Sequence, residues 1–103
     1  MILEVAILDV KLGEEPRFEE TFGRAQAIIS GMPGYLSHQL QKCIEKPSRY
    51  ILLVNWQTLE DHTIGFRESE QYQEWRSLLH SFYEPFPEVE HYTSVYPAAL
   101  AVI

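Results

Sequence analysis

The sequence predicts one α+β domain over residues 1–103, with four strands and two helices in the order βαββαβ of a ferredoxin-like fold. Two stretches carry apolar residues at helical spacing, and four others are rich in β-branched and aromatic residues. A chain of 103 residues can bury one modest core but not two. We therefore expect a four-stranded antiparallel sheet with both helices on one face.

The first strand is predicted over residues 2–11, where the only polar side chains are Glu4, Asp9 and Lys11. The next glycine ends it, and a proline in the following acidic segment suits the first turn of a helix. Residues 32–34, Met-Pro-Gly, end that helix. Its apolar stripe has helical spacing and consists of Phe18, Phe22, Ala25 and Ile29.

A β-hairpin is predicted from residues 35–44 and 49–57, which a short turn containing Pro47 connects. The fourth strand is predicted over residues 88–96 from its alternation and β-propensity. An apolar tail, residues 97–103, follows it.

The second helix is predicted to begin at Thr58, because a hydroxyl followed three residues later by an acid resembles a capping box. Leu59, His62 and Phe66 then share one helical face, and Ser69 can cap a second segment. The stripe of that second segment consists of Tyr72, Trp75, Leu79 and Phe82.

Composition excludes several classes of function. Eight basic against fifteen acidic residues give a net charge of −7 without a basic stripe, which argues against binding to nucleic acid or anionic lipid. Cys43 is the only cysteine, so no intrachain disulfide can form. It has no thiolate-stabilising neighbour in the sequence and is therefore interpreted as a packing residue. No segment resembles a signal peptide or approaches the ~20 apolar residues of a membrane helix. We expect a soluble, cytoplasmic protein.

The first and third strands look apolar on both faces, although two helices can cover only one face of the sheet. The open face is therefore expected to meet the sheet of a second copy in a homodimer. The tail 97–103 is expected to reach across that interface as an arm.

His62 and His91 are the candidate catalytic residues. His62 occupies a core-facing helical position, and imidazole titrates close to neutral pH, so it can serve as a general base. His91 lies on the last strand and can point into the same space. The alternative is that both are buried histidines whose hydrogen bonds are satisfied. His38 carries the same alternatives, and His80 is expected to face solvent.

Five aromatic side chains are candidates for the walls of a pocket for a small aromatic ligand, which requires flat apolar surfaces. The alternative interpretation is an ordinary aromatic core. The five are Trp56, Phe66, Tyr72, Trp75 and Phe82. No phosphate loop, nucleophile elbow or metal-ligand spacing is present in the sequence, so no metal is expected.

The order of these features resembles the antibiotic biosynthesis monooxygenase (ABM) family across nearly the whole chain. The shared features are Pro33-Gly34 at the second strand, Trp56, an acidic helix start followed by His62, a serine-led helix segment, and His91-Tyr92 on the last strand.

The resemblance implies a dimeric α+β barrel and a cofactor-independent monooxygenase that oxidises a small aromatic, polyketide-like or quinol substrate with O₂. His62 would be its base, and His91 would orient the substrate or donate to an oxygen. A non-catalytic small-molecule-binding or stress-response barrel is the alternative. A haem-degrading enzyme is the third possibility, but the Asn of that branch is missing from the first strand, and Phe66, not a histidine, lies ten residues after Trp56.

Overall fold

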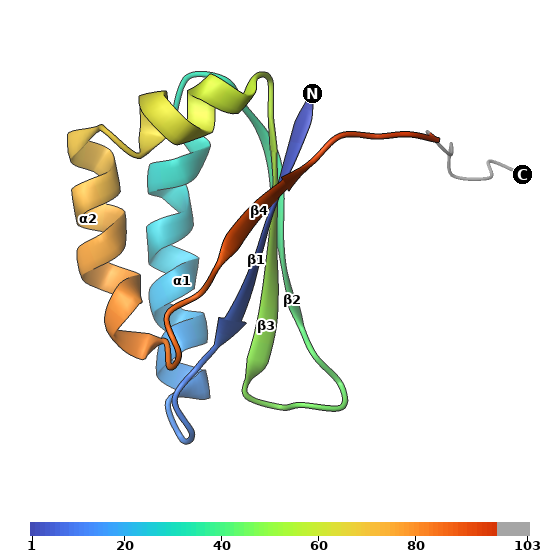
Figure 1. The fold of residues 1–103 in the computed structure, drawn as a ribbon. Coiled ribbons are helices and arrows are strands. Elements are labelled where there is room, and N and C mark those ends of the chain that lie inside the picture. Colours follow the sequence, from blue (N-terminus) through green and yellow to red (C-terminus); the bar gives the residue numbers. More distant parts are fainter. Residues whose placement is uncertain (97–103) are drawn as a thin grey trace, which may run out of the picture.

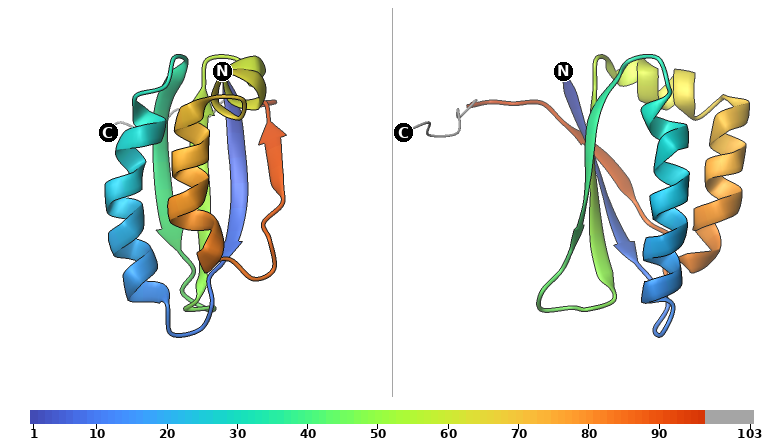
Figure 2. Two further views of the ribbon diagram at one scale, coloured as in Figure 1. Left: turned by 90° about the vertical axis from the view of Figure 1, so that its left-hand side faces the viewer. Right: turned by 180° about the vertical axis from the view of Figure 1, so that it is seen from behind.

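The computed structural model describes residues 1–96 and confirms the predicted fold class. The strands are β1 (Ile2–Asp9), β2 (Tyr35–Lys42), β3 (Arg49–Trp56) and β4 (Val89–Tyr92). They form one antiparallel sheet in the order β2-β3-β1-β4. Helices α1 (Glu15–Ser30) and α2 (Glu70–Leu79) both cover the same face of this sheet (Figures 1 and 2).

All four strands are shorter than predicted, β2 ending at Lys42 and β3 at Trp56. β1 ends at Asp9, after which Val10 makes only an isolated bridge to Tyr83. β4 spans four residues, which pair with Leu3–Ala6, because β1 offers no partner to the residues after 93. The expected arm, residues 97–103, lies outside the described residues.

The segment between β3 and α2 begins with a π-helical turn, Asp61–Phe66, and not with a regular α-helix. Thr58 and Asp61 cap it reciprocally: the Asp61 carboxylate accepts from the Thr58 amide at 3.1 Å, and the Thr58 hydroxyl accepts from the Asp61 amide at 3.2 Å. Gly34 has a φ of 84°, and a Cβ there would collide with the Asp61 side chain. The Pro-Gly turn therefore fixes where this segment starts.

Ser69 caps α2 as predicted, since its hydroxyl accepts from the Tyr72 amide at 3.1 Å. The α1 stripe is buried as predicted, and it packs with the inner sheet face into one core. Every second residue of β3 is buried in that core, from Tyr50 to Trp56. The outer sheet face, by contrast, leaves apolar side chains partly exposed.

Candidate active site

A carboxylate is buried where β1 passes beneath the π-helical turn and α2. Glu4 is 5% exposed, and its strand neighbours are Val54 of β3 and His91 of β4. Strand alternation places it on the inner face with Ala6 and Leu8, because side chains two residues apart share a face. Buried carboxylates are uncommon unless they are paired, so this residue marks a special site.

Two neighbours bind the same oxygen of Glu4. The indole Nε1–H of Trp56 donates to Oε1 at 2.9 Å, and Nε2 of His62 lies 3.3 Å from that atom. The His62 ring stacks on Trp56, with a centroid separation of 5.4 Å and an interplanar angle of 19°. Both rings are essentially buried, so the packing fixes their orientation.

His62 also contacts the last strand. Its Nδ1 lies 2.7 Å from Nε2 of His91, a hydrogen-bonding distance. Glu4, His62 and His91 therefore form a continuous chain, called the Glu–His–His chain below. The π-helical turn supplies His62, and the pairing of β4 with β1 supplies His91.

Burial shapes the electrostatics of the chain. Burial raises the pKa of Glu4, although the Trp56 hydrogen bond and the positive charge of Arg67 act in the opposite direction. Burial, assisted by the charge of Arg67 and by His91, lowers the pKa of His62 to about 3. Burial also lowers the pKa of His91. At neutral pH His62 is therefore a neutral imidazole.

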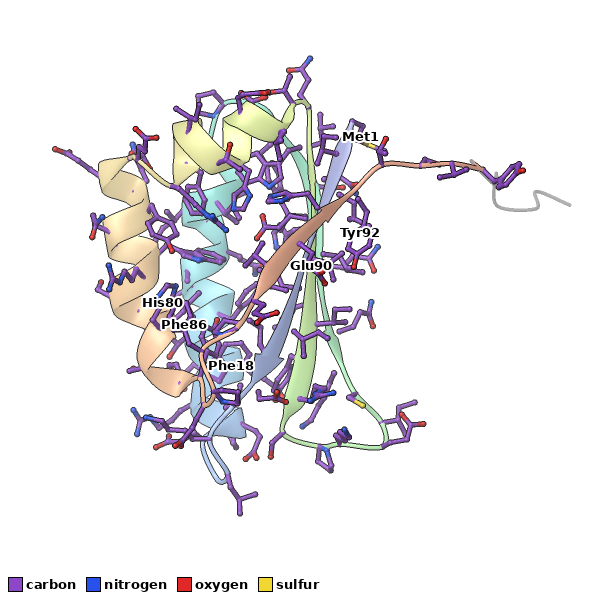
Figure 3. The ribbon with its side chains drawn as sticks, in the orientation of Figure 1. Met1, Phe18, His80, Phe86, Glu90 and Tyr92 are labelled. Atoms are coloured by element: carbon purple, nitrogen blue, oxygen red, sulfur yellow. The ribbon has the colours of Figure 1, made fainter. Side chains whose placement is uncertain are left out.

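A cavity of about 50 Å³ lies beside Glu4 and His62, between the sheet and the helical segments that follow β3. A more open hollow of about 520 Å³ adjoins it. The two share lining residues, namely Arg67, Tyr72, His80, Pro87 and Val89. Figure 3 shows His80 near the end of α2 with Phe86, which also lines the hollow, beside it.

The inner cavity is too small for an aromatic ring, since a cavity of about 150 Å³ is the size that accommodates benzene. A ring would have to enter by displacing the shared wall toward the hollow. Arg67 is exposed and, among residues 1–96, makes no salt bridge, so its charge is available at this entrance.

The structure brings most of the sequence-predicted site residues together. His62 touches both His91 and Trp56, while Phe66, Tyr72 and Trp75 line the inner cavity. Phe82 lies elsewhere: it packs against Phe18 at a centroid distance of 5.7 Å and does not line the cavity.

The two other histidines, His80 and His38, lie outside the Glu–His–His chain. The expectation that His80 faces solvent is wrong, because it lines the cavity and its Nδ1 is buried without a hydrogen-bond partner within residues 1–96. The short turn after α2 folds it inward. His38 lies between α1 and β2, where it bonds to Tyr35 and Gln26, away from the Glu–His–His chain.

Glu4 and Arg67 were not predicted as site residues. The signal for Glu4 was present, since it is the first polar residue in a strand of apolar ones. No comparable pattern distinguishes Arg67 from other surface arginines.

The Glu–His–His chain does not fit haem ligation. Nδ1 of His62 is hydrogen-bonded to His91 and Nε2 lies against the Glu4 carboxylate, so neither nitrogen is open to iron, and the cavity beside the ring has a volume of about 50 Å³. In the described part of the chain, no group of three or more His, Cys, Asp or Glu side chains is arranged to hold a metal ion. Within the same residues, no helix is long and apolar enough to cross a membrane.

Fold and site together define a small α+β protein with a buried acid–histidine chain beside an aromatic cavity. Residues 1–78 match the family described as "Antibiotic biosynthesis monooxygenase", and the chain belongs to this family.

The relatives agree with this assignment. An uncharacterised Bacillus subtilis protein, YczJ, is 57% identical over 95 residues, which cover 92% of this chain and 100% of YczJ. A Bordetella bronchiseptica protein bearing the family's name is 35% identical, with a TM-score of 0.88 over 92% of this chain and 97% of its own. SnoaB, a cofactor-independent oxygenase from Streptomyces nogalater, shares the fold at 20% identity, with a TM-score of 0.78 over 93% of this chain and 94% of its own.

Proposed function

We propose that this protein is a cofactor-independent monooxygenase that oxidises a small electron-rich phenol or quinol with O₂. The observation that carries the proposal is the Glu–His–His chain, whose buried members Glu4 and His62 line a cavity with aromatic walls. Such a chain offers a proton acceptor in a buried site, which is what this chemistry demands of the protein. Membership of the family and the shared fold of SnoaB support the same activity.

The reaction follows from proton removal. A base in the chain takes a proton from the substrate, and the resulting phenolate or carbanion passes one electron to O₂. The substrate radical and superoxide combine into a carbon–oxygen bond, giving a peroxide that the stored proton protonates. Loss of a second substrate proton cleaves the O–O bond, so one oxygen stays as a carbonyl and the other leaves as water.

Oxygen uptake by metal-free, flavin-free protein tests the proposal, with hydroquinone and the anthrone-type phenol dithranol as substrates. We expect His62→Ala to lower the rate about tenfold or more, because it breaks the chain in the middle. His38→Ala is the matched control, since it removes a histidine outside the chain. Binding of dithranol with uptake equal to the blank contradicts the proposal and favours the alternative, a non-catalytic binding module.

We also propose that two copies pack through their outer sheet faces and act as a homodimer. The supporting observation is the row of apolar side chains that no helix covers, with Ile7 46% and Tyr92 49% exposed. We expect Leu53→Glu to turn a dimer into a monomer in light scattering, whereas Leu12→Glu, at a 91% exposed position off the sheet, leaves it dimeric. A monomeric wild-type protein at micromolar concentration contradicts the proposal.

A further inference from the structure

We propose that Glu4, and not His62, is the catalytic base that receives the substrate's proton, while His62 and His91 position it. This inference rests on the proposed oxygenase function and identifies the atom that touches the substrate. It also restricts the substrate class to molecules that enter the cavity with a neutral hydroxyl group.

Both ring nitrogens of His62 already lie against other groups. Nδ1 is at hydrogen-bonding distance from His91, at 2.7 Å, and Nε2 is in close contact with Oε1 of Glu4, at 3.3 Å. To take a proton from a substrate, His62 would first have to break one of these contacts. Its ring face is also unavailable, because Trp56 stacks on it.

Glu4 has one oxygen without a hydrogen-bond partner. Oε1 accepts from Trp56 and contacts His62, whereas Oε2 makes no hydrogen bond to any of residues 1–96. Glu4 itself lines the cavity, but His91 does not. A carboxylate has lone pairs to spare on each oxygen, so the open acceptor that the chain presents to the cavity is Oε2 of Glu4.

The charges around this carboxylate also favour its role as the base. His62 is neutral at pH 7, so it orients Glu4 without neutralising it, and burial strengthens Glu4 as a base. Arg67 lines the same cavity and carries the positive charge that a newly formed phenolate needs. A ligand that already carries a carboxylate would be repelled by Glu4.

The proton-transfer step balances without any added reactant. The O–H bond of the substrate breaks, a new O–H bond forms at Oε2, and the electron pair stays on the phenolate oxygen. Glu4 becomes neutral, and it returns the proton when the peroxide forms. Nothing is oxidised or reduced in this step; the electrons move only when O₂ reacts.

Glu4→Gln is the decisive variant, since an amide keeps the size of the side chain and can still accept from Trp56, but it is not a base. We expect oxygen uptake with dithranol to fall roughly 100-fold or more, in the range that general bases contribute. Glu20→Gln, the same change at an exposed site on α1, is the control and is expected to leave the rate unchanged.

The pH profile separates a base from a positioning residue. We expect the rise in rate with pH on the acid side to disappear in Glu4→Gln. In His62→Ala the same rise persists but shifts, because Glu4 keeps its proton-accepting oxygen and loses only a neighbour. A profile that keeps its acid-side rise in Glu4→Gln, or a Glu4→Gln rate within a few-fold of the wild type, overturns the inference while the oxygenase stands.

A second measurement does not depend on turnover. The carboxyl ¹³C signal of Glu4, assigned through the β1 backbone, is followed while dithranol is added without O₂. We expect this signal to shift while that of Glu20 stays in place. A shift together with no oxygen uptake in air upholds the role of Glu4 and overturns the monooxygenase; bound dithranol that leaves the Glu4 signal unmoved overturns the role of Glu4.

Discussion

The two ends of the layer between helices and sheet bury aromatic rings in opposite ways. At one end, Phe18 packs against Tyr50 at 4.9 Å and Phe82 at 5.7 Å, and the Tyr50 hydroxyl turns outward to donate to half-exposed Glu19 at 2.6 Å. At the other end, Trp56 turns its polar atom inward, toward buried Glu4. We call these the dry end and the polar end.

The difference shows which end serves stability. The buried Tyr50 satisfies its one polar group by donating to half-exposed Glu19, whereas the Glu4 carboxylate is taken out of water together with the His62 ring. Buried ionic groups are often no better for stability than apolar residues of similar volume. We therefore expect the dry end to contribute more to the stability of the fold than the polar end.

The largest effect is expected from breaking the dry end. Phe18 is fully buried and contacts four aromatic rings, so Phe18→Ala removes apolar contact and leaves a cavity. We expect the free energy of unfolding to fall by about 3–5 kcal/mol, measured by urea denaturation. Leu12→Ala, at an exposed apolar site, is the control and should change it by less than about 0.5 kcal/mol. A loss below about 1 kcal/mol for Phe18→Ala would show that the dry end does not dominate stability.

The buried His62 at the polar end should make the folded protein less stable in acid. The pKa of His62 is about 3 in the folded protein and about 6.5 when unfolded, so the unfolded state binds more protons between these values. His62 therefore lowers stability as pH falls below about 6.5. From pH 7 to pH 5 its contribution is roughly 2 kcal/mol, measured as the change in the free energy of unfolding.

Comparison with His62→Leu tests this contribution. His91 acts with the same sign, because its pKa is also lowered, while Glu4 acts with the opposite sign, because its pKa is raised. Both remain in the variant but lose their contact with the ring, so the difference in pH dependence between the two proteins measures His62 together with these two contacts. Equal slopes in the two proteins would mean that His62 is not buried as a neutral ring.

The fold could be predicted almost completely from the sequence, because its signals are local. The α1 stripe and the cap at Ser69 both follow from residues a few positions apart. What could not be predicted is where pairing stops. β4 is short because β1 begins at Ile2, and that register is a property of two distant segments.

The candidate site was predictable only in part, for the same reason. The sequence places His62 on a buried face, but its 2.7 Å contact with His91 arises from the β1–β4 pairing. Glu4 went unrecognised because strand alternation alone does not say which face the helices cover. Phe82 was assigned to the pocket by continuing the helical stripe, although α2 ends at Leu79 and a short turn redirects the chain.

The hydroxyl of Tyr50, at the dry end, is expected to contribute little to stability. Tyr50→Phe removes the one polar atom of that ring without changing the packing around it. Because the hydroxyl bonds to a half-exposed carboxylate, we expect a loss below about 1 kcal/mol in the free energy of unfolding.

The Tyr50 hydrogen bond is the main cause that holds the pKa of Glu19 below its ordinary value, so that pKa should rise when the hydroxyl is removed. An NMR titration of the Glu19 carboxyl measures this. A carboxyl group whose pKa is lowered in the folded state stabilises the fold at pH values above its unfolded-state pKa, and this contribution disappears in acid. Because Tyr50→Phe weakens the contribution, the variant should lose less stability in acid than the wild type. A loss near that of Phe18→Ala would instead mean that polar atoms carry both ends of the core.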